Sequence, residues 1–148
     1  ATIIGASLFA LVFRGLGGDR RIEGLLAAMP GGPEQALLFV MAAIFLLGFF
    51  LDFVEISIIL LPITTPTLLL LGLDPIWLAV LIAINLQTSF LTPPFGFSLF
   101  YLRGAAPPEL TTVALYRGVV PFILVNLVAI GVVYLFPPLA TWLPRALF

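Results

Sequence analysis

The sequence predicts an all-α membrane protein, on the basis of its composition and the length of its apolar runs. Hydrophobic residues make up 62% of the 148 residues and charged residues 9%, whereas a soluble domain carries roughly 25% charged residues. A soluble fold of this length cannot hide that much apolar surface, and lipid removes this limit. The runs approach the ~20 residues that a helix needs to cross a bilayer core. They are too long for the tilted strands of a membrane barrel.

The residue types that are missing exclude several kinds of chemistry. The chain has no Cys and no His, so disulfides, thiolate metal sites, cysteine nucleophiles and histidine acid–base catalysis are excluded. All six basic residues are Arg, the net charge is -1, and no basic patch exists for nucleic acid. Without a nucleophile–base pair or a metal-ligand cluster, we do not expect an enzyme.

Residues 1–34 predict the end of a truncated transmembrane helix followed by an amphipathic arm helix. The apolar start has no Met and no charged leader, so we interpret it as a cut end and not as a signal peptide. Glycines at 15–18 break the helix. From Arg20 to Met29 the apolar side chains recur at helical spacing, which predicts a helix lying in the membrane interface. These side chains are Ile22, Leu25, Leu26 and Met29.

Residues 35–73 form an apolar stretch that is interrupted at residues 48–52, and two interpretations are open. Either two full spans join at Asp52, or a re-entrant helical hairpin has arms that meet near the middle of the membrane. Each arm of about 16–18 residues reaches only ~25 Å, and Gly48, Asp52 and Glu55 stand among bulky apolar residues instead of a polar loop. We favour the hairpin, in which Asp52 lies deep and is functional by default. A separate interpretation of Asp52 and Glu55 is that they simply pair with Arg residues in the missing part of the same protein.

Residues 74–106 predict a discontinuous transmembrane helix. Asp74 and Pro75 suit the cap and first position of a helix. Pro93 and Pro94 remove two backbone donors, and Thr92 is pushed toward an extended conformation. The carbonyls that we expect to lose their helical partners are those of Gln87, Thr88, Ser89, Phe90 and Leu91.

Free carbonyls cannot face lipid, so the break is expected to face protein, water or an ion. Asn85, Gln87, Thr88, Ser89 and Thr92 add side-chain oxygens, and transporters build ion sites from such unwound helices. The half-helix that follows would point its N-terminal dipole at a substrate carboxylate. Simpler interpretations also exist. The prolines would then form only a kink, Asn85 would bond between helices, and three aromatic side chains would face lipid or pack. These are Phe95, Phe97 and Phe100.

Residues 107–148 predict an interfacial connection and the last transmembrane helix. We expect a short helix from Glu109 and a span over residues 119–143. Tyr134 and Trp142 would act as interfacial anchors near one end. Arg103 and Arg117 would mark an interface.

Several motifs together resemble one family. They are Gly48-Phe-Phe-Leu-Asp52, Asn85-Leu-Gln-Thr-Ser-Phe-Leu-Thr-Pro-Pro-Phe-Gly96, Leu99-Phe-Tyr-Leu-Arg-Gly104, Arg117-Gly-Val-Val-Pro-Phe122 and Phe136-Pro-Pro-Leu139. They strongly resemble the C-terminal part of the large membrane subunit of tripartite ATP-independent periplasmic (TRAP) transporters. Ser89-Phe90-Leu91 departs from the pattern, since the family often has a small residue or Gly there. The departure bears on the substrate more than on the fold.

The resemblance implies more than the residues themselves indicate. It implies the second inverted repeat of an elevator-type transporter in the bacterial inner membrane, importing organic acids with sodium. The implied partners are a small four-helix membrane subunit, a periplasmic substrate-binding protein, the missing N-terminal part of the same subunit and membrane lipid.

We therefore expect a membrane subunit of a sodium-coupled organic-acid symporter. Its binding residues would be Gly48, Asp52, Asn85, Gln87, Thr88, Ser89, Thr92, Pro93, Pro94 and Gly96. Sodium, the coupling ion and the only expected cofactor, would be held by the backbone of Gln87, Thr88, Ser89, Phe90 and Leu91. The alternative is a structural or channel-forming membrane subunit without coupled transport.

Overall fold

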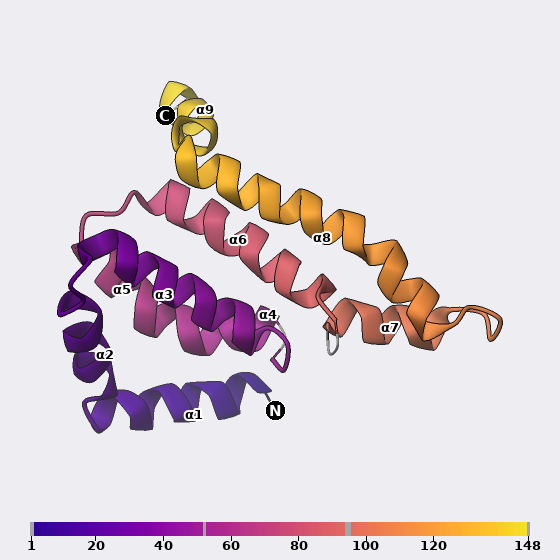
Figure 1. The fold of residues 1–148 in the computed structure, drawn as a ribbon. Coiled ribbons are helices and arrows are strands. Elements are labelled where there is room, and N and C mark those ends of the chain that lie inside the picture. The colour runs from indigo at the N-terminus through magenta and orange to yellow at the C-terminus, as the bar shows by residue number, and fades with distance from the viewer. Residues whose placement is uncertain (1, 52, 94–95, 148) are drawn as a thin grey trace.

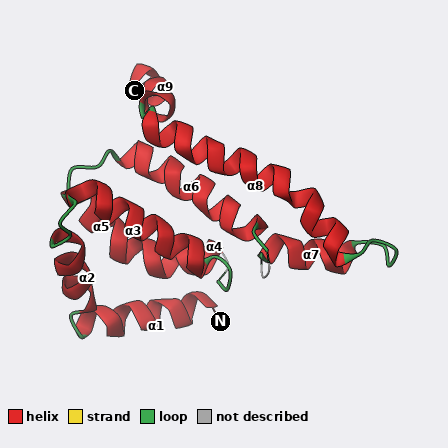
Figure 2. Cartoon of the chain, viewed as in Figure 1, coloured by secondary structure: helices red, strands yellow, loops and turns green. Residues whose placement is uncertain are grey.

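The computed structural model describes residues 2–51, 53–93 and 96–147, and in these ranges it contains helices and turns but no strand (Figure 2). The first half contains α1 (Thr2–Gly15), α2 (Gly18–Ala27), α3 (Gly32–Leu47), α4 (Phe53–Glu55), the π-helical turn η1 (Ile56–Leu60) and α5 (Leu61–Leu70). The second half contains α6 (Pro75–Leu91), α7 (Phe97–Ala105), α8 (Thr112–Leu135) and α9 (Pro138–Leu147). The all-α prediction is confirmed for the described residues.

The expected arm helix is α2, which begins two residues earlier than the apolar pattern suggested. Leu26 is 1% exposed, and Ile22 and Met29 pack beside it against the core. Leu25 is instead exposed, so the buried face is narrower than expected. This face packs on α5 and α3, and the position of α2 in a membrane interface stays a prediction.

A helical hairpin forms from α3 and the helix that follows it. The chain turns at residues 48–51 and returns through α4, η1 and α5, which lie beside α3 (Figure 1). This antiparallel arrangement fits both interpretations of residues 35–73, two joined spans and a re-entrant hairpin, and Asp52 lies outside the described residues. At 1.5 Å per residue the 16 residues of α3 extend about 24 Å, less than a bilayer core of ~30 Å. That the hairpin is re-entrant remains a prediction.

Two prolines shape the second arm of the hairpin. Pro62 has no N–H to donate to the carbonyl of Ile58, four residues earlier. Just before it the helix widens, and the N–H of Leu61 bonds to the carbonyl of Ile56, five residues back. Pro66 interrupts the same arm one turn later. The arm nevertheless stays helical over 18 residues, long and apolar enough to cross a membrane.

The core lies where α6 meets the hairpin. In Figure 1, α6 runs between α3 on one side and α8 on the other, and it contacts both. The side chains buried at this meeting include Leu37, Val40, Ile44, Leu78, Leu81, Ile82 and Leu86. Residues 74–106 contain α6 and α7, and the described residues 92, 93 and 96 between them are not helical; that they form one discontinuous transmembrane helix stays a prediction.

The C-terminal region differs from the prediction at both ends of its long helix. No helix starts at Glu109, because residues 107–110 form a turn and Thr111 instead caps α8, accepting a hydrogen bond from the N–H of Ala114 at 3.2 Å. The expected span over residues 119–143 stops early because Pro137 cannot donate to the carbonyl of Val133. That carbonyl accepts a hydrogen bond from Trp77 Nε1 at 2.8 Å. The chain then continues as the separate helix α9.

Helix α8 is the longest helix of the described chain, and it is strongly apolar. Its 24 residues extend about 36 Å, enough to cross a bilayer core. Its most hydropathic window has none of its residues buried in the structure. Large apolar side chains such as Phe122, Val125 and Val128 point outward instead. A helix with this outer surface needs lipid or another protein around it.

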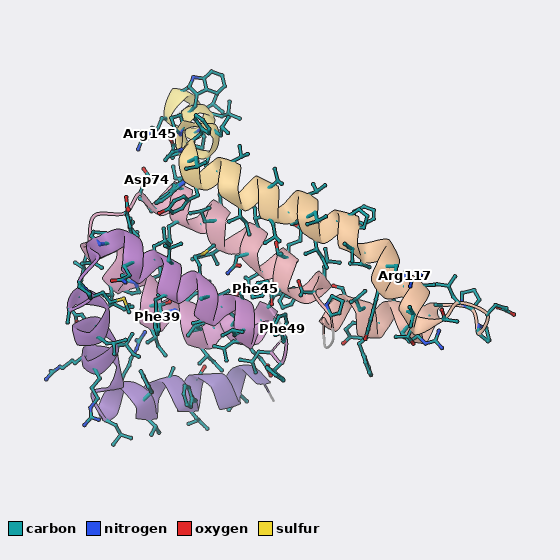
Figure 3. All side chains as sticks on the ribbon, in the orientation of Figure 1. Phe39, Phe45, Phe49, Asp74, Arg117 and Arg145 are labelled. Carbon is teal, nitrogen blue, oxygen red and sulfur yellow. The ribbon has the colours of Figure 1, made fainter. Side chains whose placement is uncertain are left out.

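Asp74 joins the start of α6 to α9. Its Oδ1 accepts hydrogen bonds from the N–H groups of Ile76 at 2.9 Å and Trp77 at 3.0 Å, which caps α6. Its Oδ2 pairs with Arg145 of α9 at 2.6 Å (Figure 3). The Trp77 N–H and the Arg145 guanidinium both favour the ionised carboxylate, so the pKa of Asp74 lies below its ordinary value. The stabilisation is therefore present above about pH 4 and is lost as acid protonates the carboxylate.

We expect Asp74→Ala to lower the free energy of unfolding by about 1 kcal/mol, because α6 loses its N-cap. Asp74→Asn keeps an oxygen that accepts from the same N–H groups, so it should cost less, mainly the exposed ion pair with Arg145. The measurement is unfolding by dodecyl sulfate in mixed micelles. Glu109→Ala, in the exposed turn before α8, is the control. If the Ala and Asn variants lose the same unfolding free energy, the stabilisation by Asp74 comes from its charge and not from its hydrogen bonds at the helix cap.

Candidate functional site

The turn of the hairpin lies against the end of α6. Ser89 Oγ donates a hydrogen bond to the carbonyl of Phe45 at 2.8 Å. That carbonyl needs an outside donor because α3 ends at Leu47 and the N–H of Phe49 turns to Leu46 at 3.3 Å. Ser89 is 0% exposed, so the bond is shielded from water. One hydroxyl therefore completes the end of α3 and joins it to α6.

Gly48 allows this close approach. A Cβ at position 48 would stand 2.0 Å from Ser89 Oγ and 2.9 Å from Ser89 Cβ. Any side chain at 48 would therefore displace Ser89 or the turn. Gly48 and Ser89, both among the expected binding residues, therefore lie in contact. The expected binding residues Asp52 and Pro94 lie outside the described residues.

Asn85 repeats the Ser89 contact one helical turn earlier. Its Nδ2 donates a hydrogen bond to the carbonyl of Met41 at 2.8 Å, and the residue is 4% exposed. Met41 and Phe45 are one turn apart on α3, as Asn85 and Ser89 are on α6. The two contacts match the interpretation in which Asn85 bonds between helices, and they hold α3 and α6 in fixed register.

The carbonyls at the end of α6 are less free than predicted. The helix continues through Leu91, so Gln87 lies within it. Pro93 has no N–H for the carbonyl of Ser89, and the N–H of Thr92 donates to it instead at 3.1 Å. Thr92 Oγ1 donates to the carbonyl of Thr88 at 2.7 Å. The expectation of five unpartnered carbonyls is therefore wrong for Thr88 and Ser89.

Thr88 also bonds within its own helix. Its Oγ1 donates to the carbonyl of Ile84 at 2.7 Å, and the residue is fully buried. Thr92 adopts the extended conformation expected before a proline, with φ -84° and ψ 123°. Thus Thr88 and Thr92 act on the backbone of α6 in this structure, and they end the helix in a defined way.

Gly96 lies beside carbonyl groups of the break. Its N–H donates to the carbonyl of Thr92 at 3.1 Å. A Cβ at position 96 would stand 2.5 Å from the oxygen of Phe90 and 2.9 Å from the oxygen of Thr92. Two carbonyl oxygens therefore converge on a place that only glycine leaves open. The carbonyl of Phe90 is also one that Pro94, four residues later, has no N–H to satisfy.

A cleft of about 480 Å³ opens between α4, α6 and α7. Its described lining combines aromatic side chains with two polar ones, Gln87 of α6 and Ser98 of α7, and contains no Arg or Lys. Gln87 is exposed there, whereas Ser89, two residues later, faces α3. The cleft is lined by Phe53, Ala83, Leu86, Gln87, Phe90, Leu91 and Ser98.

Phe53 and Ser98 were not among the predicted site residues. Ser98 lies in the first turn of α7, at the positive end of the helix dipole, where the N–H groups of Leu99 and Phe100 donate to the carbonyl of Gly96. The position of Ser98 two residues after Gly96, at the start of the second half-helix, was the sequence feature that could have indicated a binding role. Phe53 enters the cleft only through the fold of the hairpin. Of the three aromatic residues after the break, Phe100 is 76% exposed and fits the lipid-facing interpretation.

Acidic side chains do not gather at this site. Over residues 2–51, 53–93 and 96–147 there is no group of three or more His, Cys, Asp or Glu side chains able to hold a metal ion. The oxygens that the described residues place at the break, beside Gly96, are backbone carbonyls, which suit a monovalent ion better than a divalent one.

Comparison with known proteins was made on the whole chain. A family model described as "Tripartite ATP-independent periplasmic transporter, DctM component" matches residues 1–139. The C4-dicarboxylate TRAP transporter large permease protein DctM of Pseudomonas aeruginosa is 30% identical over 97% of this chain and 33% of its own length. The 2,3-diketo-L-gulonate TRAP transporter large permease protein YiaN of Escherichia coli is 32% identical over 79% of this chain and 27% of its own length.

A third relative is named for a different kind of organic acid. The sialic acid TRAP transporter permease protein SiaT of Haemophilus influenzae is 28% identical over 86% of this chain and 20% of its own length. The chain thus spans between a fifth and a third of the length of these relatives.

The contact between Gly48 and Ser89 predicts strong coupling of two substitutions. Gly48→Ala should lower the free energy of unfolding by about 1–3 kcal/mol, because the new Cβ collides with Ser89. Ser89→Gly removes both colliding atoms, so Gly48→Ala should cost much less in that background. The double-mutant cycle is measured by dodecyl sulfate unfolding.

Gly131→Ala is the matched control, since a Cβ there meets nothing within 4 Å and Ala favours the helix. Additive effects of Gly48→Ala and Ser89→Gly would contradict the contact.

Proposed function

Because the chain belongs to the DctM component family of tripartite ATP-independent periplasmic transporters, we propose that it forms the ion- and substrate-binding part of a sodium-coupled importer of organic acids. The observation that carries this proposal is the contact of Gly48 with Ser89. Through it the hairpin turn lies against the helix break, and the cleft of Gln87 and Ser98 opens beside them. A plain scaffold of spanning helices has no need of a hairpin turn locked onto an interrupted helix.

The cleft suits a carboxylate with an uncharged body. The first-turn N–H groups of α7 carry the positive end of the helix dipole, and Ser98 stands among them. Gln87 adds amide donors, and Phe53 and Phe90 supply apolar walls. Its size falls within the range of pockets for small organic ligands. The relatives named for C4-dicarboxylate, 2,3-diketo-L-gulonate and sialic acid support an organic acid as the substrate class.

Sodium would bind at the break, next to Gly96. The carbonyl oxygens of Phe90 and Thr92 converge there. A monovalent cation held by neutral oxygens needs no carboxylate, and unwound helices bind coupling ions in this way in other transporters. Relative to the site expected from sequence, the carbonyls of Thr88 and Ser89 contribute less, since both already accept bonds from Thr92. The carbonyl of Thr92 likewise accepts the N–H of Gly96, so the carbonyl of Phe90, which Pro94 cannot satisfy, would be the main ligand from the break.

The complete transporter would sit in the bacterial inner membrane. There the chain would work as the second inverted repeat of the large subunit and move as an elevator. Its partners would be the remainder of that subunit, a small four-helix membrane subunit, lipid and a periplasmic binding protein that delivers the acid. The family match and the permease relatives support this assembly. Transport across the membrane is the activity proposed, with no catalysed reaction and no nucleic acid.

The sodium site is tested by Gly96→Ala in the complete transporter. The Cβ would occupy the place where the oxygens of Phe90 and Thr92 converge, so those carbonyls must turn away. The measurement is uptake into proteoliposomes with the binding protein present. The sodium concentration for half-maximal uptake should rise about tenfold or more, because roughly one charge-assisted contact to the ion is lost.

Gly104→Ala is the control within the same helix, because a Cβ at 104 meets open space. Thr92→Val, which removes the hydroxyl bonded to Thr88, should also shift the sodium curve. An unchanged curve for Gly96→Ala and Thr92→Val would reduce the break to a kink and place sodium elsewhere.

The carboxylate site is tested separately by Gln87→Leu and Ser98→Ala. Each removes a donor that we assign to the substrate, so the KM for the acid should rise about tenfold, with the sodium curve little changed. Ser57→Ala is the matched control, since Ser57 lines a different groove. A KM that stays constant in both variants would remove the cleft from the substrate pathway.

A further inference from the structure

Helix α9 has an apolar face that nothing in the described chain covers. Its four large apolar side chains are each more than half exposed and fall on one arc of the helix. They are Leu139, Trp142, Leu143 and Leu147. With 10 residues, α9 extends only about 15 Å and cannot cross a bilayer. Most of it also lies beyond the residues that match the family model, which end at 139.

The polar side of α9 faces the protein. Thr141 is 4% exposed, and its Oγ1 donates to the carbonyl of Pro137 at 3.2 Å. Arg145 pairs with Asp74 at the cap of α6. A free amphipathic helix on a membrane turns such groups to water. Here the contacts with α6 and α8 decide which face points outward, and the outward face is the apolar one.

The position of α9 indicates what covers this face. Figure 1 shows α9 turning away from the end of α8 and lying across the ends of α6 and α8. Exposed apolar side chains run along α8 through Val128, Val132 and Leu135, and they continue into Leu139 of α9. Since α8 is long and apolar enough to cross the bilayer, we expect its end to lie at the boundary of the hydrocarbon core.

Aromatic residues of the interfacial type gather at the same level. The rings of Trp77 and Tyr134 lie 5.8 Å apart at the start of α6 and the end of α8. Trp142 is 69% exposed on α9 nearby. Trp and Tyr prefer the headgroup level of a membrane, where an apolar ring and a polar edge are both satisfied.

We propose that α9 is an interfacial lipid-binding helix, held flat against the ends of α6 and α8 by the Arg145–Asp74 pair with its apolar face in the acyl–headgroup boundary. The proposal is independent of sodium and of the substrate. In this proposal the ion pair orients the membrane contact. By holding Arg145 against Asp74 it fixes which side of α9 faces the protein, and so which side faces the lipid.

The test is a nitroxide scan of the complete large subunit in vesicles of phosphatidylethanolamine and phosphatidylglycerol. Single cysteines replace Leu139, Trp142, Leu143 and Leu147 after removal of any other cysteine; these 148 residues contain none. Collisions with oxygen, which concentrates in lipid, are compared with those of a water-soluble nickel chelate. Val125 of α8, 67% exposed, is the reference for a deep lipid position.

We expect oxygen collisions to exceed nickel collisions at the four positions, at a shallower depth than position 125. Dominant nickel collisions would place the face in water and overturn the proposal. Low values for both reagents would mean that another subunit or a second copy of the chain covers it. A depth equal to that of position 125 would put α9 inside the core instead of at its boundary.

The role of the ion pair is tested by Arg145→Gln in the variant labelled at position 143. Loss of the pair should increase the mobility of the label and reduce the difference between oxygen and nickel collisions. Arg117→Gln, at an exposed Arg of α8, should leave both unchanged. An unaltered spectrum for Arg145→Gln would show that the pair does not orient the helix.

Discussion

The structure depends on finding donors for the carbonyls that prolines and helix ends leave without a helical partner. In a chain surrounded by lipid these groups cannot turn to water, and each unsatisfied one is costly. Pro137 leaves the carbonyl of Val133 to Trp77 Nε1, and the end of α3 leaves that of Phe45 to Ser89 Oγ. Both bonds cross between helices. The requirement to satisfy the backbone therefore also fixes how α6 sits between α3 and α8.

The two arms of the hairpin contact α6 unequally, although the second arm packs well on α1, α2 and α3. The first arm, α3, is tied to α6 through Met41, Phe45 and the close approach at Gly48. Between the second arm and α6 there is instead a groove of about 300 Å³, and Thr65 Oγ1 is buried beside it without a hydrogen-bond partner. An interface with a groove and an unsatisfied polar group opens at lower cost than a hydrogen-bonded one. In the proposed transport cycle, separation of the hairpin from α6 should therefore start on the side of the second arm.

Local chemistry explains which parts of this arrangement the sequence predicts. Proline pairs, glycines and apolar length act over a few residues, so the hairpin, the break before Pro93 and the cap at Asp74 were all predictable. The helix boundaries after residue 107 were not predictable in this way. The last long helix is capped by Thr111 and no helix begins at Glu109, and the prolines at 137 and 138 divide one apolar run into α8 and α9. The free carbonyls were over-predicted because Thr92 supplies both a backbone and a side-chain donor. The cleft residues Phe53 and Ser98 come together only through long-range packing.

The lack of Arg and Lys in the described cleft lining has a consequence for the proposed coupling of acid binding to sodium binding. The described cleft lining has no Arg or Lys, and the oxygens near Gly96 are carbonyls. Such a site stabilises either a carboxylate or a sodium ion only partly, because dipoles replace less hydration energy than a full opposite charge does. When both ions bind near each other, their attraction in a low-dielectric environment supplies the missing part. By linkage each ion then raises the affinity for the other by the same factor. Adding an Arg to the cleft would strengthen acid binding without sodium and so weaken the coupling. For the proposed sodium-coupled import, a described cleft lining without Arg or Lys beside carbonyl oxygens would thus make binding of the acid depend on the cation.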